Sequence, residues 1–362
     1  MIYRAIGVMS GSSLDGLDIA FAEFQENAGK WSYEIRQASC YPYDEDWSGR
    51  LETASTLPAL DYQLLHTEYG HYIGQQVNKF INEYGLEFQV ALISSHGHTT
   101  FHIPQKRMTT QLGDGASIAA ETGLPVVCDL RALDVAFGGQ GAPIVPIGEK
   151  WLLEDYDFFL NIGGIANISF NQESYTAFDI CAANRVLNML AKEIGKEYDD
   201  QGMIAAGGTI KTALLEKLNA LEFYKRTYPK SLANDFGTDV VYPMIHSMDH
   251  EIKDSLRTYV EHIVIQIRNA ISMSPSINQN ARILITGGGA FNTFLIERLR
   301  DELKELSIEI VVPDENLVKY KEAMIMAFMG VLRWRQEYNV LSSVTGASRN
   351  SIGGALWTGQ EA

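Results

Sequence analysis

The stretch Gly7-Val-Met-Ser-Gly-Ser-Ser-Leu-Asp-Gly16 decides how this chain is interpreted, because three similar glycine-rich stretches follow it. They are Gly138-Gly-Gln-Gly-Ala-Pro143, Asn161-Ile-Gly-Gly-Ile-Ala-Asn167 and Thr286-Gly-Gly-Gly-Ala-Phe-Asn292. Three of the four follow a short apolar run that predicts a strand. Glycine has no Cβ, so such turns can bring backbone N–H groups close to a ligand, and rows of N–H groups bind phosphate. Four such turns indicate a nucleotide held in a cleft between two similar halves.

The composition is that of a folded protein with two domains. A chain of 362 residues exceeds a comfortable single core, and 46% apolar with 20% charged residues is ordinary for folded proteins. The formal net charge of −16 argues against a nucleic-acid or anionic-membrane partner, because phosphate backbones select basic surfaces. The three widely spaced cysteines form neither a disulfide framework nor a zinc pattern. With no signal peptide and no run of about 20 apolar residues, a cytoplasmic protein is expected.

Strand-like and helix-like runs alternate along the chain, which predicts an α/β fold. Residues 5–9 and 17–25 read as a hairpin around the first turn, and residues 157–162 and 165–170 read as a hairpin around the third. A long helix is predicted over residues 60–84 from its apolar periodicity. Both halves therefore open with a strand, a glycine turn and a second strand, which indicates an internal duplication.

This duplication sets the expected domain boundaries. We expect a first domain from residues 1–156 plus 340–362, and a second from residues 157–339. In the second, residues 175–178 predict a strand that ends at Asp179 and is followed by a helix.

The first turn carries hydroxyl groups and one carboxylate. Ser10 and Ser12, with the backbone of Gly11, suit phosphate oxygens, and Asp15 suits a hydrated Mg²⁺. The alternative is a Ser/Gly hairpin with an Asp turn residue, since turns use these residues often.

Asp179 is the candidate general base. In α/β sheets ligands bind at the C-terminal ends of strands, and a carboxylate there suits proton transfer from a water or a sugar hydroxyl. The alternative role is a helix N-cap, which Asp often supplies. Position alone favours neither.

Two other patterns suggest chemistry more weakly. His96, His98 and His102 are closely spaced, but no nearby carboxylate or cysteine completes a metal site, so hydrogen bonding to a substrate or to the backbone is favoured. Cys181 lies two residues after Asp179 and suggests a nucleophile, but a small buried thiol is the favoured interpretation.

Taken together, the motifs resemble those of the 1,6-anhydro-N-acetylmuramic acid kinases over nearly the whole chain. The opening stretch resembles the family's Gly-x-Met-Ser-Gly-Thr-Ser-x-Asp-Gly, and Ser95-His-Gly-His-Thr99 resembles Ser-His-Gly-Gln-Thr. Further matching stretches are Gln111-Leu-Gly-Asp-Gly115, Asp129-Leu-Arg131 through Pro143, Asn161 to Asn167, Pro229-Lys-Ser231, Gly287-Gly-Gly-Ala290 and Ser343-Val-Thr-Gly-Ala347.

The resemblance implies an actin-like ATPase (ribonuclease H-like) fold, in which two domains with duplicated phosphate-binding hairpins enclose a cleft. It implies a cytoplasmic kinase of cell-wall peptidoglycan recycling and amino-sugar metabolism, with ATP and Mg²⁺ as cofactors. In that reaction water opens the 1,6-anhydro bridge at C1 while ATP phosphorylates O6, giving N-acetylmuramic acid 6-phosphate and ADP. A homodimer is the family's usual state.

The resemblance also implies roles for individual residues. Asp179 aligns with the catalytic aspartate. The aligned phosphate-binding and adenosine-side positions are Ser10, Gly11, Ser12, Gly163, Gly164, Gly287, Gly288 and Gly289. The aligned sugar-site candidates are Thr99, Arg131 and Glu322, and Arg131 suits a bidentate contact with the lactyl carboxylate.

The chain departs from the family pattern in two places. Phe178-Asp-Ile-Cys-Ala-Ala-Asn184 replaces Phe-Asp-Thr-Gly-Pro-x-Asn, and Lys319-Tyr-Lys-Glu-Ala323 stands where the family often has Asp-Trp before Glu-Ala. These changes leave two alternatives open. One is an actin-fold kinase for another sugar or acyl acceptor, and the other is a non-catalytic ATP-binding relative.

Overall fold

The computed structural model describes residues 1–11, 14–172, 175–228, 230–233, 235–248 and 250–359. The chain divides into two compact units. The first comprises Met1–Leu153 and Tyr320–Ala362, and the second comprises Glu154–Lys319. Ser12, a predicted phosphate ligand, lies outside the described residues.

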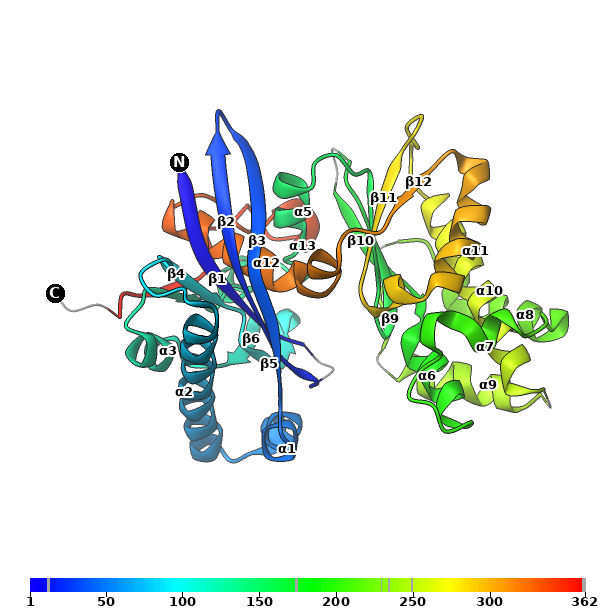
Figure 1. Cartoon of the computed structure of the whole chain (residues 1–362), viewed down its shortest axis with the longest axis horizontal. Coiled ribbons are helices and arrows are strands. Elements are labelled where there is room, and N and C mark those ends of the chain that lie inside the picture. Colours follow the sequence, from blue (N-terminus) through cyan, green and yellow to red (C-terminus); the bar gives the residue numbers. More distant parts are fainter. Residues whose placement is uncertain (12–13, 173–174, 229, 234, 249, 360–362) are drawn as a thin grey trace. The chain divides into compact units, whose positions relative to one another are not determined.

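The first unit is built on a six-stranded sheet in the order β13-β7-β4-β1-β2-β3 (Figure 1). Strands β1, β2 and β3 pair antiparallel in a meander, while β4 pairs parallel with β1 and β7 parallel with β4. A separate two-stranded sheet joins β5 and β6. The strands are β1 (Ile2–Ser10), β2 (Gly16–Asn27), β3 (Lys30–Pro42), β4 (Leu92–Ser95), β5 (His98–Ile103), β6 (Met108–Leu112), β7 (Val126–Cys128) and β13 (Ala355–Trp357).

Helix α2 (Ala59–Tyr84) lays an apolar face against this sheet. It follows Pro58 and is capped by Gly85, which takes the left-handed conformation (φ 61°) that glycine tolerates. Its buried residues, such as Tyr69, Ile73 and Val77, share one core with residues of β1 and β2, because positions three and four apart fall on the same side of a helix. The other helices that lie in this unit are α1 (Glu45–Thr53), α3 (Gly115–Thr122), α4 (Ala132–Ala136), α5 (Pro146–Leu152) and α13 (Ser342–Thr345).

The second unit repeats the central topology of the first. Its sheet has the order β10-β9-β8-β11-β12, with β8, β9 and β10 antiparallel and β11 and β12 parallel (Figure 1). The strands are β8 (Phe158–Ile162), β9 (Ile165–Phe170), β10 (Thr176–Ala182), β11 (Arg282–Thr286) and β12 (Glu309–Val311). Each unit thus has a three-stranded meander extended by two parallel strands. The predicted α/β class, with duplicated hairpins in an actin-like arrangement, is confirmed.

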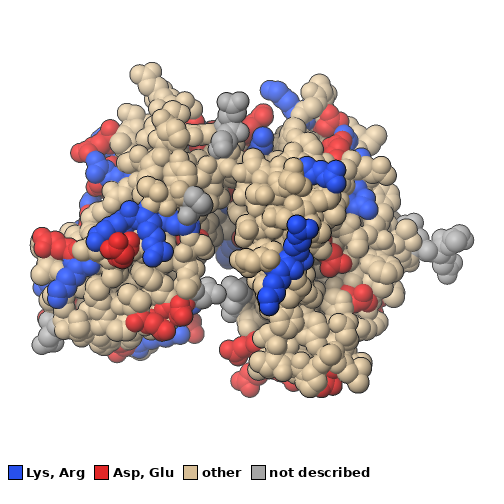
Figure 2. Space-filling model, turned by 180° about the vertical axis from the view of Figure 1, so that it is seen from behind, with Lys and Arg blue, Asp and Glu red and all other residues tan. Residues whose placement is uncertain are grey.

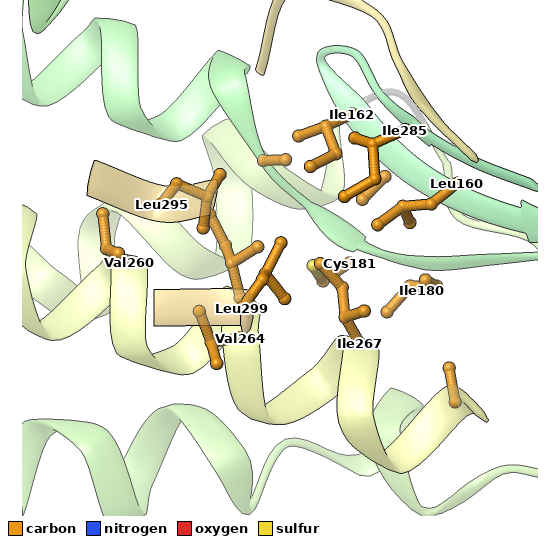
Figure 3. Close-up of a cluster of buried hydrophobic side chains, with 14 of the residues drawn as sticks. Leu160, Ile162, Ile180, Cys181, Val260, Val264, Ile267, Ile285, Leu295 and Leu299 are labelled. Atoms are coloured by element: carbon orange, nitrogen blue, oxygen red, sulfur yellow. The ribbon is translucent and has the colours of Figure 1, made fainter. Parts of the chain in front are cut away.

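Helices α10 and α11 pack on the second sheet. Cys181 of β10 lies among aliphatic side chains that include Ile267 of α10 and Leu299 of α11 (Figure 3). The helices that lie in this unit are α6 (Asn184–Lys192), α7 (Met203–Ala206), α8 (Thr212–Asn219), α9 (Tyr242–His246), α10 (Ile252–Ile271) and α11 (Thr293–Leu303).

Helix α12 (Glu315–Trp334) crosses the boundary between the units and is kinked at Tyr320 (φ −114°, ψ 15°). Beyond the kink it packs closely on β1, where a Cβ on Gly7 would lie only 1.8 Å from the carbonyl oxygen of Ala323. This packing accounts for a boundary at residues 319/320, whereas the sequence-based domain prediction divides the chain at 339/340. The predicted boundary at 156/157 lies close to the one at 153/154.

The distribution of surface charge and the apolar character of the helices relate to the composition of the sequence. Acidic and basic side chains are interspersed on the face seen in Figure 2. Within the described ranges, no helix combines the length and apolar character that crossing a membrane requires.

Candidate active site

Asp179 lies at a β-bulge inside β10, not at the end of the strand as the sequence predicts. It pairs with Asn167 of β9, the register shifts between Asp179 and Cys181, and the strand continues to Ala182. The N-cap of the following helix is Ala183, so Asp179 is not a helix cap. A bulge of this kind redirects a side chain locally, and a local pattern of apolar residues does not reveal it.

One carboxylate oxygen of Asp179 is fixed by a distant segment. Oδ2 accepts hydrogen bonds from Ser231 Oγ (2.8 Å) and from the Leu232 backbone N–H (2.8 Å). The Asp179 N–H in turn donates to the carbonyl of Lys230 (3.1 Å). Among the described residues, both hydrogen bonds to the side chain fall on Oδ2, and Oδ1 accepts none. The family motif containing Ser231 was recognised in the sequence, but no role for this residue followed from it.

The third turn, between β8 and β9, is formed by Gly163 and Gly164. Their carbonyl oxygens accept hydrogen bonds from Asn184 N–H (3.0 Å) and Ala183 N–H (2.8 Å), which tie the turn to the start of α6. A Cβ at Gly163 would have its nearest neighbour at 3.4 Å, and one at Gly164 at 3.7 Å. These are ordinary van der Waals contacts, so packing within the chain does not demand glycine at either position.

The fourth turn uses its glycines differently. Gly287 has φ 81°, and a Cβ there would lie 2.4 Å from Asn161 Oδ1, while a Cβ at Gly289 would lie 2.2 Å from Ile162 Cγ2. Both glycines are therefore required by close packing on β8. Of the three, Gly288 borders the adjacent pocket.

That pocket lies entirely within the second unit and has a volume of about 430 Å³. Its wall includes Asn188 from α6, Gly288 and Phe291 from the fourth turn, and Tyr198. Phe291 and Tyr198 are 43% and 57% exposed, so their aromatic rings are accessible. The volume suits a small ligand, and aromatic faces suit stacking against a planar base. Sequence reasoning anticipated the glycine turn but not the residues that face it.

Ser10 ends β1 at the first turn of the first unit and is held on two sides. Its buried Oγ is hydrogen-bonded to His98 Nδ1 (3.0 Å) and accepts from the Tyr43 hydroxyl (2.8 Å). The Tyr43 hydroxyl also meets that of Tyr69 (2.6 Å). Gly11 follows Ser10, and Asp15 is exposed farther along the turn. This series of hydrogen bonds, from Tyr69 through Tyr43 and Ser10 to His98, orients the hydroxyl of Ser10, which is a predicted phosphate ligand.

Arg131 is half-buried and oriented by two acceptors. Its Nε donates to His96 Nε2 (2.8 Å) and its Nη1 to the carbonyl of Gly141 (2.6 Å). Burial lowers the pKa of Arg131 to about 10, while the nearby Glu322 carboxylate opposes that shift. Two of the three sugar-site candidates, Arg131 and Glu322, therefore lie within electrostatic reach of each other. Thr99 is exposed and accepts from Gln111 Nε2 (3.4 Å).

The three histidines all make hydrogen bonds. Those of His96 include one to a backbone carbonyl, the kind of bond favoured from the sequence, whereas His98 meets the Ser10 side chain. Because His96 Nε2 accepts from Arg131, its Nδ1 carries the proton that it shares with the Gly97 carbonyl (2.8 Å). Burial and the Arg131 charge lower the pKa of His96 to about 3, so the ring is neutral. His102 Nδ1 meets Thr109 Oγ1 (3.1 Å). Within the described ranges, His, Cys, Asp and Glu do not form a group of three suited to a metal ion.

Comparison with known proteins identifies the family. The family model for "Anhydro-N-acetylmuramic acid kinase" matches residues 3–359. The chain belongs to the anhydro-N-acetylmuramic acid kinase family. A relative of that name from Vibrio parahaemolyticus is 31% identical and is covered over 98% of both chains. Another, from Haemophilus influenzae, is 30% identical over 97% of both.

Solved structures show only a distant likeness. The activator of 2-hydroxyisocaproyl-CoA dehydratase from Clostridium difficile, with bound ADPNP, is 13% identical, with a TM-score of 0.47 and coverage of 92% of this chain and 96% of that one. A ROK family glucokinase from Streptomyces griseus, in complex with glucose and AMPPNP, is 11% identical, with a TM-score of 0.41 and coverage of 91% and 99%. The sheet topology, described above, carries the fold assignment.

The residues that depart from the family pattern after Asp179 point into the core. Ile180, Cys181 and Ala182 are each at most 1% exposed. Burial raises the pKa of the Cys181 thiol, which disfavours the thiolate that a nucleophile needs. Figure 3 shows this thiol packed among aliphatic groups, as favoured from the sequence. The substitutions therefore change the packing beneath the bulge and not a ligand-facing surface.

Asp18 is a functional candidate that sequence reasoning missed. It lies on β2, two residues after the first turn. Burial raises the pKa of Asp18 to about 6, a hydrogen bond from Cys40 opposes the shift, and the charges of Asp15 and Glu322 add to it. Three carboxylates of the first unit thus lie within electrostatic reach of one another. Asp18 lies two residues after the recognised motif, and this proximity is the one sequence signal that could have pointed to it.

Proposed function

We propose that the protein converts 1,6-anhydro-N-acetylmuramic acid, ATP and water into N-acetylmuramic acid 6-phosphate and ADP. The oxygen of water forms a bond to C1 as the C1–O6 bond breaks. O6 forms a bond to the γ-phosphorus as the bond from that phosphorus to the β,γ-bridging oxygen breaks. The proton lost by water passes to a base. O6 is released from C1 as it receives the phosphoryl group, so it needs no base of its own.

Asp179 is the base in this proposal, and the geometry of its carboxylate is the observation that carries it. Ser231 and Leu232 hold Oδ2, which fixes the plane of the carboxylate and leaves Oδ1 for the attacking water. A base held in this way is oriented before the substrate arrives, which reduces the entropic cost of reaching the transition state. The family resemblance aligns the same residue with the catalytic aspartate.

The second unit supplies the nucleotide site in this proposal. The pocket bordered by Gly288 would take the adenosine, with Phe291 and Tyr198 available for stacking. The backbone of the Gly163-Gly164 turn would receive phosphate oxygens. Its place at the β8–β9 hairpin corresponds to that of Ser10 and Gly11 at the β1–β2 hairpin, which would likewise bind phosphate oxygens.

Mg²⁺ would accompany ATP and neutralise charge on its phosphates. The residues fit such an ion, because Mg²⁺ keeps most of its waters and needs few protein carboxylates, and Asp15 is an exposed carboxylate on the first turn. Asp15 would hold the hydrated ion through water.

Recognition of the sugar would fall to Arg131, Glu322 and Thr99. Arg131 has its Nε and one Nη1 hydrogen committed to His96 and Gly141, which aims its remaining N–H groups. Those groups suit the lactyl carboxylate of the muramic acid. Because the residues replaced beside Asp179 are buried, the structure gives no reason to expect a different acceptor.

The test is sugar-dependent ADP release. Purified protein receives Mg-ATP with the anhydro sugar and, in parallel, with N-acetylmuramic acid or glucose. Turnover with the anhydro sugar alone is expected. ATP binding without turnover on any of these sugars would contradict the proposal. We further propose a cytoplasmic homodimer, for which light scattering after gel filtration should give a mass near twice the 40.3 kDa of the chain.

A further inference from the structure

Arg185 lies beside the glycine turn of the second unit. It is the second residue of α6, whose start is tied to the carbonyls of Gly163 and Gly164. A Cβ built on Gly164 would lie 3.7 Å from Nε of Arg185, and one built on Gly237 would lie 3.8 Å from its Cδ. The side chain therefore runs along the turn, with Nε of its guanidinium next to Gly164.

The position of this arginine breaks a local rule of helix design. The N-terminus of a helix carries partial positive charge, so a cation in the first turn is unfavourable and acidic residues are preferred there. The first turn of α6 has no acidic residue and places Arg185 instead. Local choices that disfavour the fold tend to occur at functional sites.

Two lysines also lie near the candidate site. Lys319, at the pocket, pairs with Glu315 and lies over the ring of Phe291. Lys230, whose carbonyl accepts a hydrogen bond from Asp179 N–H, lies over the ring of Phe223. The first turn, residues 10–18, contains no lysine or arginine. Phosphoryl transfer nevertheless develops negative charge that enzymes neutralise with metal ions and positioned cations.

We infer that Arg185 binds the phosphate chain of ATP at the Gly163-Gly164 turn and stabilises the transferring phosphoryl group. The inference rests on the proposed function, because that function makes this turn a phosphate site. A guanidinium suits the role, since it stays charged and its planar N–H groups match phosphate oxygens. Arg185 neither gives nor takes a proton in the reaction, because it contributes only hydrogen bonds and charge.

The experiment compares Arg185→Met with Lys192→Met, a matched charge removal at an exposed position in the last turn of the same helix. We expect Arg185→Met to lower kcat/KM for ATP by about 100-fold or more, since a positioned arginine contributes 10³–10⁵ in related reactions. Lys192→Met should stay within about twofold of wild type. Calorimetry without sugar should show weaker binding of ATP to Arg185→Met and unchanged binding of adenosine.

The calorimetric measurements distinguish the proposed role of Arg185 from the proposed function. If the wild-type protein does not turn over the anhydro sugar but its ATP affinity depends on Arg185, the proposed function fails and the phosphate role stands. Equal kcat/KM values for Arg185→Met and Lys192→Met, or equal losses for ATP and adenosine, would overturn the inference. If Arg185→Met does not fold, Arg185→Gln replaces it, with the same expected losses and the same contradicting results.

Discussion

The two glycine turns occupy equivalent places in equivalent sheets, yet they are built from different chemistry. In the first unit, the β1–β2 turn begins with the Ser10 side chain, which His98 and Tyr43 orient. In the second, the β8–β9 turn has no side chains at Gly163 and Gly164, and the backbone at the start of α6 holds it. The repeated topology fixes where a turn lies. The sequence within the turn then decides whether side-chain hydroxyls or bare backbone face a ligand.

The divergence extends to the strands beside each turn. The second unit carries the proposed base Asp179 on a bulged strand, whereas the first unit carries the Asp15, Asp18 and Glu322 carboxylates and the half-buried Arg131. The four predictions that follow test whether these groups have the separate roles that this comparison assigns them.

The largest effect is expected for Asp179→Asn. Loss of a general base should lower kcat by about 10²–10⁴-fold, while ATP affinity should change little because the nucleotide pocket is formed by other residues. Steady-state kinetics with the anhydro sugar and calorimetry with ATP measure the two quantities. Turnover near the wild-type rate would remove Asp179 from the mechanism.

Ser231→Ala should have a smaller effect on the same group. The substitution removes one of two hydrogen bonds to Oδ2 and keeps the Leu232 N–H. A hydrogen bond to a charged group contributes about 1.5–3 kcal/mol. Only part of that energy orients the base for reaction, so we expect kcat to fall by about tenfold. Ser231→Thr is the control and should retain most activity. A Ser231→Ala enzyme as slow as Asp179→Asn would show that Ser231 does more than orient the base.

Asp18→Asn tests the carboxylates of the first unit through stability. The folded-state pKa of Asp18 is raised to about 6 from 3.8, so the native state holds its proton more tightly than the unfolded chain. Stability from this group is thus present below about pH 4 and is lost as pH rises through about 6. The shift corresponds to at most about 3 kcal/mol, and partial solvation should reduce it to about 1–2.

Asn mimics the protonated carboxyl, so Asp18→Asn should raise the urea midpoint at pH 8 and leave it nearly unchanged at pH 4. If the variant were less stable than wild type at pH 8, the claim that the charged form of Asp18 destabilises the folded state would be contradicted. The midpoint is the appropriate measure because two units need not unfold together.

The smallest effect is expected for His98→Gln, which installs the residue that the family motif has at this position. Glutamine can still hydrogen-bond Ser10, so kcat/KM for ATP should stay within about threefold of wild type. His98→Ala should lose about five- to tenfold, because Ser10 then keeps only Tyr43 as its partner in this chain of hydroxyls. Identical kinetics for the two variants would show that the bond to Ser10 has no role in ATP use.

Much of the fold follows from local sequence signals. The strands before the turns are short apolar runs, and the hairpin over 157–170 matches β8 and β9 almost residue for residue. Apolar periodicity likewise predicts α2 within one residue of its bounds. These features depend on neighbours a few residues apart, which a single sequence displays.

The site was less accessible to such reasoning because its contacts join distant segments. Ser231 meets Asp179 across 52 residues, and His98 meets Ser10 across 88. The bulge that shifts Asp179 from a strand end to a strand interior has no local pattern, and the raised pKa of Asp18 depends on Glu322, far along the chain. The sequence pointed toward these residues only through nearby family motifs, and the structure adds the contacts that each side chain makes.

The most direct test of the account is the mass of the sugar product formed from the anhydro sugar and ATP. We predict a product that has gained one water and one phosphoryl group together, in equal amount to the ADP released. Such a product requires both opening of the anhydro bridge and transfer to O6. A product that gained only the phosphoryl group would retain the ring and place transfer on another hydroxyl, and ADP formed without any sugar product would show that the protein hydrolyses ATP without the coupled reaction.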